Sequence, residues 1–174
     1  YYAYFSPGNT TEKVVSHIAS SFQNYPVESI NLTDYATRQE DYYFKENELL
    51  IIGVPAYGGR VPAPVVDALR HFTGSNTPVV LVATYGNRDI DDTLIELKKN
   101  VIDKGFIPVG AASFVCQHTF LKECAEGRPD EEDLKMAGEF GDKLKERLRL
   151  LVTYDAGDLE VPGTFPYTKP PMGE

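Results

Sequence analysis

A short run of hydroxyl, amide and glycine residues follows the first apolar stretch of the chain. This run contains Ser6, Gly8, Asn9, Thr10 and Thr11, and a helix-like spacing of apolar residues begins at Val14. The first N–H groups of a helix lack partners within the helix and carry partial positive charge, so a loop here can bind an anion without a basic side chain. Ser, Asn and Thr also commonly cap helices. The run alone is compatible with a phosphate site or with a simple cap.

Two further loops combine a tyrosine with glycines. The second loop contains Pro55, Ala56, Tyr57, Gly58, Gly59 and Arg60, and the third contains Thr84, Tyr85, Gly86, Asn87 and Arg88. Each follows a continuous apolar run. Glycine lets the main chain approach a flat ligand, and an aromatic ring can stack on one. If all three loops meet, they predict a site for a phosphorylated aromatic cofactor, of which flavin mononucleotide (FMN) fits best.

The elements that must position these loops alternate between strand and helix. Apolar runs and alternation predict five strands, near residues 2–5, 27–32, 49–54, 78–83 and 106–115. Helical spacing predicts four helices, near residues 11–22, 61–72, 90–102 and 129–151. Pro108 and Gly110 indicate an edge or a bulge in the last strand. The signal over residues 33–48 is weak and allows a short helix plus a loop.

This alternation predicts an α/β fold with one parallel sheet covered by helices on both faces. In such sheets, ligands bind beyond the carboxyl ends of the strands. The three loops all follow strands, so they should lie at that edge. Their convergence favours the cofactor site over three unrelated loops.

The sequence resembles a flavodoxin-like domain, in particular the N-terminal half of flavodoxin–ferredoxin fusion proteins. The resemblance covers nearly the whole chain and rests on residues 4–7, 53–62, 85–88 with 91–92, and 127–130. It implies a flavodoxin-like three-layer sandwich with strand order 2-1-3-4-5. It also implies that Ser6, Asn9, Thr10 and Thr11 hold the FMN phosphate, and that residues 55–60 and 84–88 flank the ring. Asn9 stands where the family usually has glycine, and Asn tolerates the left-handed conformation better than most residues.

Composition narrows the possible partners. The chain has 174 residues and a net charge of −9, which argues against nucleic acid or an anionic membrane as the main partner. No apolar run is long enough to cross a membrane, and two cysteines and three histidines show no metal or disulfide spacing. We expect a cytoplasmic protein with a domain over residues 1–152 and a Pro- and Gly-rich tail or linker over residues 153–174. The sequence assigns no oligomeric state.

Electron transfer is the expected function, with the flavin supplying the redox chemistry and no catalytic residue required. The resemblance implies a redox partner such as a ferredoxin, or a ferredoxin domain attached after the tail. An alternative is an FMN enzyme that reduces quinones or similar acceptors with NAD(P)H, in which His118 beside Tyr57 and Phe120 would donate a proton. A third is a flavin-free signalling module with the same strand order, which Ser6 and Pro55 at the usual carboxylate positions disfavour.

Overall fold

The computed structural model describes residues 1–150 and 159–170. Along the chain the elements are β1 (Tyr2–Tyr4), α1 (Thr10–Ser20), β2 (Ser29–Asn31), the 3₁₀ turn η1 (Thr37–Gln39), β3 (Tyr42–Phe44), β4 (Leu50–Pro55), α2 (Ala63–Ala68), the 3₁₀ turn η2 (Leu69–His71), β5 (Phe72–Gly74), β6 (Thr77–Tyr85), α3 (Thr93–Ile102), β7 (Phe106–Val115) and α4 (Glu131–Leu150).

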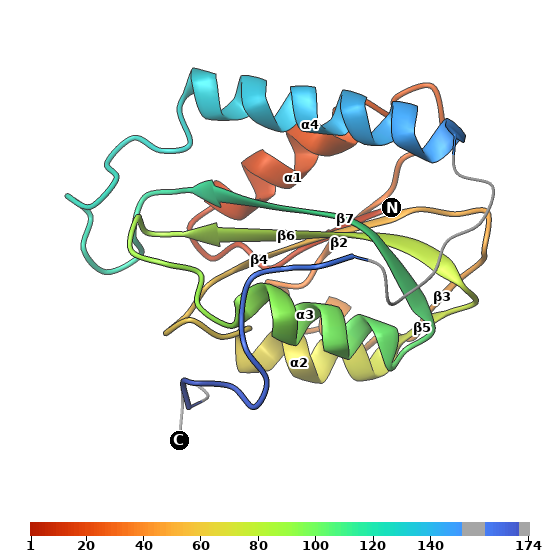
Figure 1. Ribbon diagram of the computed structural model, residues 1–174, viewed down its shortest axis with the longest axis horizontal. Helices are drawn as coiled ribbons and strands as arrows, with labels where there is room; N and C mark the ends of the chain where they lie inside the picture. Colours follow the sequence, from red (N-terminus) through yellow and green to blue (C-terminus); the bar gives the residue numbers. More distant parts are fainter. Residues whose placement is uncertain (151–158, 171–174) are drawn as a thin grey trace.

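Five parallel strands form one sheet in the order β2-β1-β4-β6-β7. This is the predicted order 2-1-3-4-5, because β3 and β5 pair with each other outside this sheet. Helices α1 and α4 cover one face of the sheet, and α2 and α3 cover the other (Figure 1). Each face has its own buried apolar cluster, so the three-layer sandwich is confirmed.

The small pair β3–β5 corrects two expectations. The weak region 33–48 contains a strand, and the helix predicted to reach residue 72 ends as α2 at Ala68. Phe72 is fully buried in β5 and packs against Phe44 and Tyr42, with ring centroids 5.5 and 5.0 Å away. This aromatic packing outweighs the helical spacing of the preceding residues, since tertiary contacts override local propensity.

The predicted irregularity in the last strand is present. In the β6–β7 ladder, Val79 pairs with Pro108 and Val80 with Gly110, which leaves Val109 as an extra residue in β7. Strand β7 is also at the edge of the sheet, where a proline can be accommodated.

The described part of the tail, residues 159–170, contains neither helix nor strand and lies against α3 (Figure 1, dark blue). The remainder of the predicted tail, and residue 151 of the predicted last helix, lie outside the described residues. Within the described chain, no helix is long and apolar enough to cross a membrane, and no group of His, Cys, Asp and Glu side chains could hold a metal ion.

Candidate functional site

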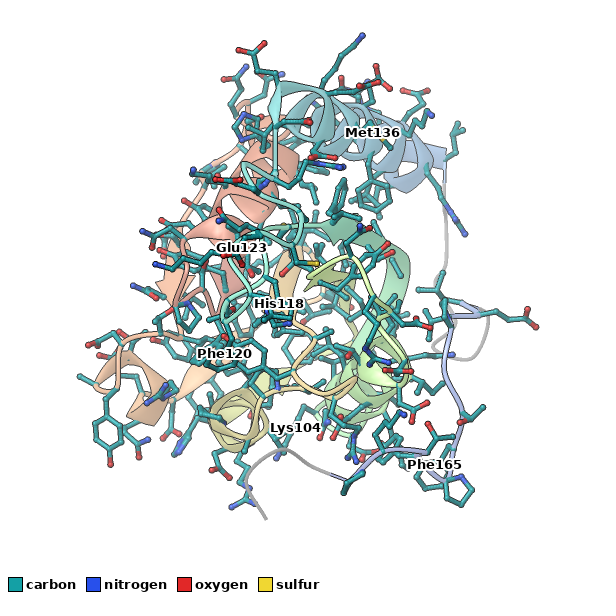
Figure 2. The ribbon with its side chains drawn as sticks, turned by 90° about the vertical axis from the view of Figure 1, so that its left-hand side faces the viewer. Lys104, His118, Phe120, Glu123, Met136 and Phe165 are labelled. Carbon is teal, nitrogen blue, oxygen red and sulfur yellow. The ribbon has the colours of Figure 1, made fainter. Side chains whose placement is uncertain are left out.

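The three loops meet at the carboxyl edge of the sheet, together with a fourth loop, residues 116–124, that follows β7. Figure 2 looks onto this edge and shows His118 near its centre, with Phe120 and Glu123 on the same fourth loop. A cavity of about 110 Å³ lies between the loops. Its lining comes from Thr10, Pro55, Ala56, Tyr57, Gly58, Thr84, Tyr85, Gly86, Cys116, Gln117, His118, Thr119 and Phe120.

The first loop both caps α1 and leaves donors free. Ser6 is buried, and its Oγ accepts a hydrogen bond from the Glu12 N–H at 3.0 Å, so Ser6 caps the helix. The N–H groups of Gly8, Thr10 and Thr11 donate to no group in the described chain. A Cβ added at Gly8 would meet no atom within 4 Å, so the space there is open. The N-terminus of α1 therefore offers main-chain donors to an anion.

Two threonines and Asn9 shape this loop. Asn9 has φ 60° and ψ 1°, the left-handed conformation that its residue type tolerates. The Thr11 hydroxyl is buried against the Thr84 hydroxyl at 2.8 Å, which ties the first loop to the end of β6. Thr11 therefore contributes its N–H group, and not its side chain, to the candidate anion site.

The second loop turns sharply so that Tyr57 reaches the cavity. The N–H of Tyr57 donates to the Arg60 carbonyl and the N–H of Arg60 to the Tyr57 carbonyl, at 3.0 and 3.1 Å. Gly58 and Gly59 between them have φ of 59° and 81°, values that glycine adopts without strain. Such a turn places a tyrosine beside an exposed glycine main chain, as the sequence predicts for a loop that flanks a ring.

Arg60 lies away from the cavity. Its guanidinium makes two hydrogen bonds of 2.7 Å to the Glu96 carboxylate on α3, and the pair is nearly buried. The Glu96 carboxylate raises the pKa of Arg60, so this guanidinium is permanently charged. Arg88 is directed to Asp91, and its side chain is largely exposed. The structure thus places neither arginine in the cavity lining, and the same holds for Ser6, Gly8, Asn9, Thr11, Gly59 and Asn87.

The fourth loop brings His118 against Gly86, where an added Cβ would come within 2.4 Å of His118 Cδ2. His118 Nδ1 accepts hydrogen bonds from the N–H groups of Phe120 and Leu121 at 3.1 and 3.0 Å, so the neutral ring carries its proton on Nε2. The Cys124 thiol donates to the Gly86 carbonyl at 3.1 Å. These contacts fix the fourth loop to the third.

The sequence prediction includes His118 but not Cys116, Gln117, Thr119 or Phe120, which line the same cavity. The available signal was the strand order, because the loop after the last strand must lie beside the loop after its neighbour β6. Burial raises the pKa of the Cys116 thiol to about 12, although a hydrogen bond with the Thr10 side chain opposes this. Cys116 is therefore a neutral wall of the cavity and not a thiolate nucleophile.

Comparisons with known proteins agree with this architecture. No family model matches the sequence, and no curated protein sequence matches it. Among solved structures, a flavodoxin from the domain Archaea is similar, with a TM-score of 0.58 and 13% identity over 85% of this chain and 96% of that one. A Fusobacterium nucleatum flavodoxin bound to flavin mononucleotide has a TM-score of 0.57 and 18% identity, over 84% of this chain and 96% of that one. A Streptococcus pneumonia TIGR4 flavodoxin has a TM-score of 0.55 and 15% identity, over 84% of this chain and 97% of that one. With the sheet order, these similarities show that the chain has the flavodoxin fold.

Proposed function

We propose that this chain binds FMN at the carboxyl edge of its sheet and acts as an electron-transfer domain. The observation that carries the proposal is that main-chain donors and aromatic rings lie side by side at this edge. The partnerless N–H groups at the start of α1 lie beside a cavity whose lining includes both Tyr57 and Tyr85. An anion site next to aromatic rings fits a phosphorylated flat cofactor. The Fusobacterium nucleatum structure of the same fold, which is bound to FMN, supports the assignment.

The residues present fit this cofactor. Gly8, Thr10 and Thr11 would hold the phosphate through main-chain N–H groups, and neutral donors suffice because the helix dipole favours the anion. The second and third loops would flank the ring. The cavity is smaller than pockets that enclose a ligand of this size, so the cofactor would lie partly at the surface. Bound FMN would supply the electron-carrying chemistry, while the chain binds and orients it.

Titration of the apo-protein with FMN tests the proposal through quenching of flavin fluorescence. We expect saturable quenching at micromolar FMN. Riboflavin, which lacks the phosphate, should bind about tenfold more weakly or worse if the start of α1 holds that group. The absence of quenching by FMN would refute the proposal.

A matched pair of tyrosine changes tests the ring site. Tyr85→Ala should raise the Kd for FMN by about 5- to 150-fold, the range expected for losing one stacking contact. Tyr43 on β3 is 74% exposed and outside the cavity lining, so Tyr43→Ala should leave the Kd unchanged. Equal effects of the two changes would contradict the assignment of the ring site.

The partner belongs to the same proposal. We propose a redox protein as electron donor or acceptor, and a ferredoxin as its specific form. Phe120 and Leu121 are 75% and 60% exposed beside the cavity, which gives a partner an apolar contact next to the flavin. Mixing the FMN-loaded chain with reduced ferredoxin under anaerobic conditions should bleach the flavin absorbance within seconds. A reducing compartment such as the cytoplasm fits the two free thiols.

A second candidate is an NAD(P)H-dependent reductase, which the position of His118 in the cavity lining favours. Its Nε2–H is a donor that could face a bound acceptor. Oxidation of NAD(P)H with a quinone acceptor by the FMN-loaded chain would support this candidate. Loss of that turnover in His118→Ala, with FMN still bound, would assign the proton to His118.

A further inference from the structure

The described tail is bound tightly to the rest of the molecule. Residues 159–170, here called the strap, cross α3 towards the carboxyl edge of the sheet (Figure 1). The Lys98 ammonium donates to the Leu159 carbonyl at 2.6 Å. Further along, an added Cβ at Gly163 would come within 2.4 Å of Ile95 Cγ2, so the main chain of the strap lies directly on α3. Phe165, at the periphery in Figure 2, covers the Lys99 ammonium.

The strap surrounds Asp92, the residue that precedes α3. The Asp92 carboxylate accepts four hydrogen bonds, from the N–H and hydroxyl of Thr164 at 2.9 and 3.2 Å and from those of Thr168 at 2.6 and 2.8 Å. Asp92 is only 2% exposed. An aspartate here usually caps its own helix, but this side chain makes no such bond. Asp92 therefore serves as the attachment point of the strap.

The strap also completes the surroundings of Arg60. The Arg60 guanidinium donates to the Lys169 carbonyl at 2.6 Å, in addition to its two bonds to Glu96. The ring of Tyr167 lies over the guanidinium, with 4.1 Å between the Arg60 Cζ and the ring centroid. Without the strap, this nearly buried cation would lose one of these three hydrogen bonds and the aromatic ring over its face.

Both attachment points connect to the second loop, which flanks the cavity. The Asp92 N–H donates to the Gly59 carbonyl at 2.9 Å, which joins the chain after the third loop to the second loop. Arg60 closes the turn that carries Tyr57. We propose that the strap is a positioning part of the cavity: through Asp92 and Arg60 it fixes the second and third loops in the arrangement that receives the ring. The consequence for FMN rests on the function proposed above.

The test removes the strap hydroxyls from Asp92 while keeping the full chain. Thr164→Val with Thr168→Val preserves side-chain shape but deletes two hydrogen bonds to the carboxylate. In the apo-protein, we expect faster hydrogen exchange at the Arg60 and Asp92 N–H groups, and unchanged exchange at the Tyr2 and Leu32 N–H groups, which join β1 to the segment around β2. The Kd for FMN should rise about tenfold. The double variant Thr164→Ser with Thr168→Ser keeps the hydroxyls, so its exchange rates and its Kd for FMN should equal those of wild type.

Thr37→Val is the matched control, because the Thr37 N–H and hydroxyl also donate to an aspartate, Asp34, at 2.9 Å each, without contact to the strap. This variant should leave loop exchange and FMN affinity unchanged. If the double valine variant lowers the melting temperature but leaves both loop exchange and the Kd for FMN as in wild type, the strap is only a structural cover and the inference is wrong. Hydrogen exchange needs no cofactor, so it decides the inference even if wild type does not bind FMN.

Discussion

At the scale of single residues, Asn9 has the left-handed conformation that begins the proposed anion site. It is the N-cap residue of α1, and its φ of 60° turns the main chain so that the following N–H groups point out of the helix start. Its side chain makes no capping hydrogen bond. The role of Asn9 is therefore conformational, which makes it testable by substitutions that change only backbone preference.

Replacing Asn9 by alanine should lower the free energy of unfolding by about 1 kcal/mol, because alanine adopts the left-handed conformation less readily than asparagine does. Asn9→Gly should stay within about 0.5 kcal/mol of wild type, since relief of strain and greater freedom of the unfolded chain nearly cancel. Urea unfolding of the apo-protein measures both. An alanine variant as stable as the glycine variant would mean that this conformation is not under strain.

The sequence predicts the conformation of Asn9 but not the position of the Arg60 side chain. The tolerance of Asn for φ near 60° is a property of the residue type, so its conformation could be expected at once. Arg60 could not be placed in this way. Its partners Glu96 and Lys169 are 36 and 109 residues away in sequence, and only the fold shows that they lie closer to its guanidinium than the cavity does.

At the scale of elements, the contact between α1 and β4 sets how close the first loop lies to the sheet. Gly53 in β4 faces α1, and an added Cβ would be 2.1 Å from Val15 Cγ2 and 3.1 Å from Thr11 Cγ2. Val15 is fully buried. The Thr11 hydroxyl is hydrogen-bonded to the hydroxyl of Thr84 on β6. The absence of a side chain at Gly53 therefore lets α1, β4 and β6 come together under the first loop.

Gly53→Ala should therefore destabilise the chain by about 2 kcal/mol, because a well-packed core cannot absorb an extra methyl without moving α1. The control is Gly138→Ala on α4, where an added Cβ meets nothing within 4 Å. That change should stabilise the chain by about 0.5 to 1 kcal/mol, as alanine is the better helix former. Thermal unfolding of both variants checks the opposite signs, and a neutral Gly53→Ala would refute the close packing.

The main elements were predictable because their signals are strong. Continuous apolar runs mark the buried strands β4 and β6, and their loops had to share one edge of a parallel sheet. The pair β3–β5 was missed because each strand has three residues, too few for alternation to stand out. Their pairing depends on the aromatic cluster around Phe72, which forms only when distant segments come together.

At the scale of the whole molecule, the strap joins the end of the described chain to its middle. A Pro- and Gly-rich composition predicts a tail or linker, and residues 159–170 contain neither helix nor strand, but composition contains no sign of where they attach. The attachment depends on a charge. Burial by itself raises the pKa of the Asp92 carboxyl, but the hydrogen bonds from Thr164 and Thr168 outweigh burial and lower that pKa to about 2. Folding therefore favours the ionised carboxylate.

This charge makes attachment of the strap dependent on pH. Because the pKa of Asp92 is lower in the folded chain than the usual 3.8, its contribution to stability is complete above about pH 5 and is lost as the pH falls towards 2. The amide in Asp92→Asn cannot ionise, so this variant should have a free energy of unfolding about 2 kcal/mol or more below that of wild type at pH 6. The difference in unfolding free energy between wild type and this variant should then shrink by about 1 kcal/mol between pH 6 and pH 3.

Urea unfolding followed by circular dichroism at the two pH values measures this difference, with Asp142→Asn, a change at an exposed carboxylate on α4, as the control. General acid destabilisation of a chain with 26 acidic residues affects wild type and variants alike, so it cancels in the comparison. A carboxylate that the folded chain stabilises in its ionised form gives a difference that narrows in acid. A difference between wild type and Asp92→Asn that stays constant from pH 6 to pH 3 would show that the strap is held by its apolar and main-chain contacts and not by the charge of Asp92.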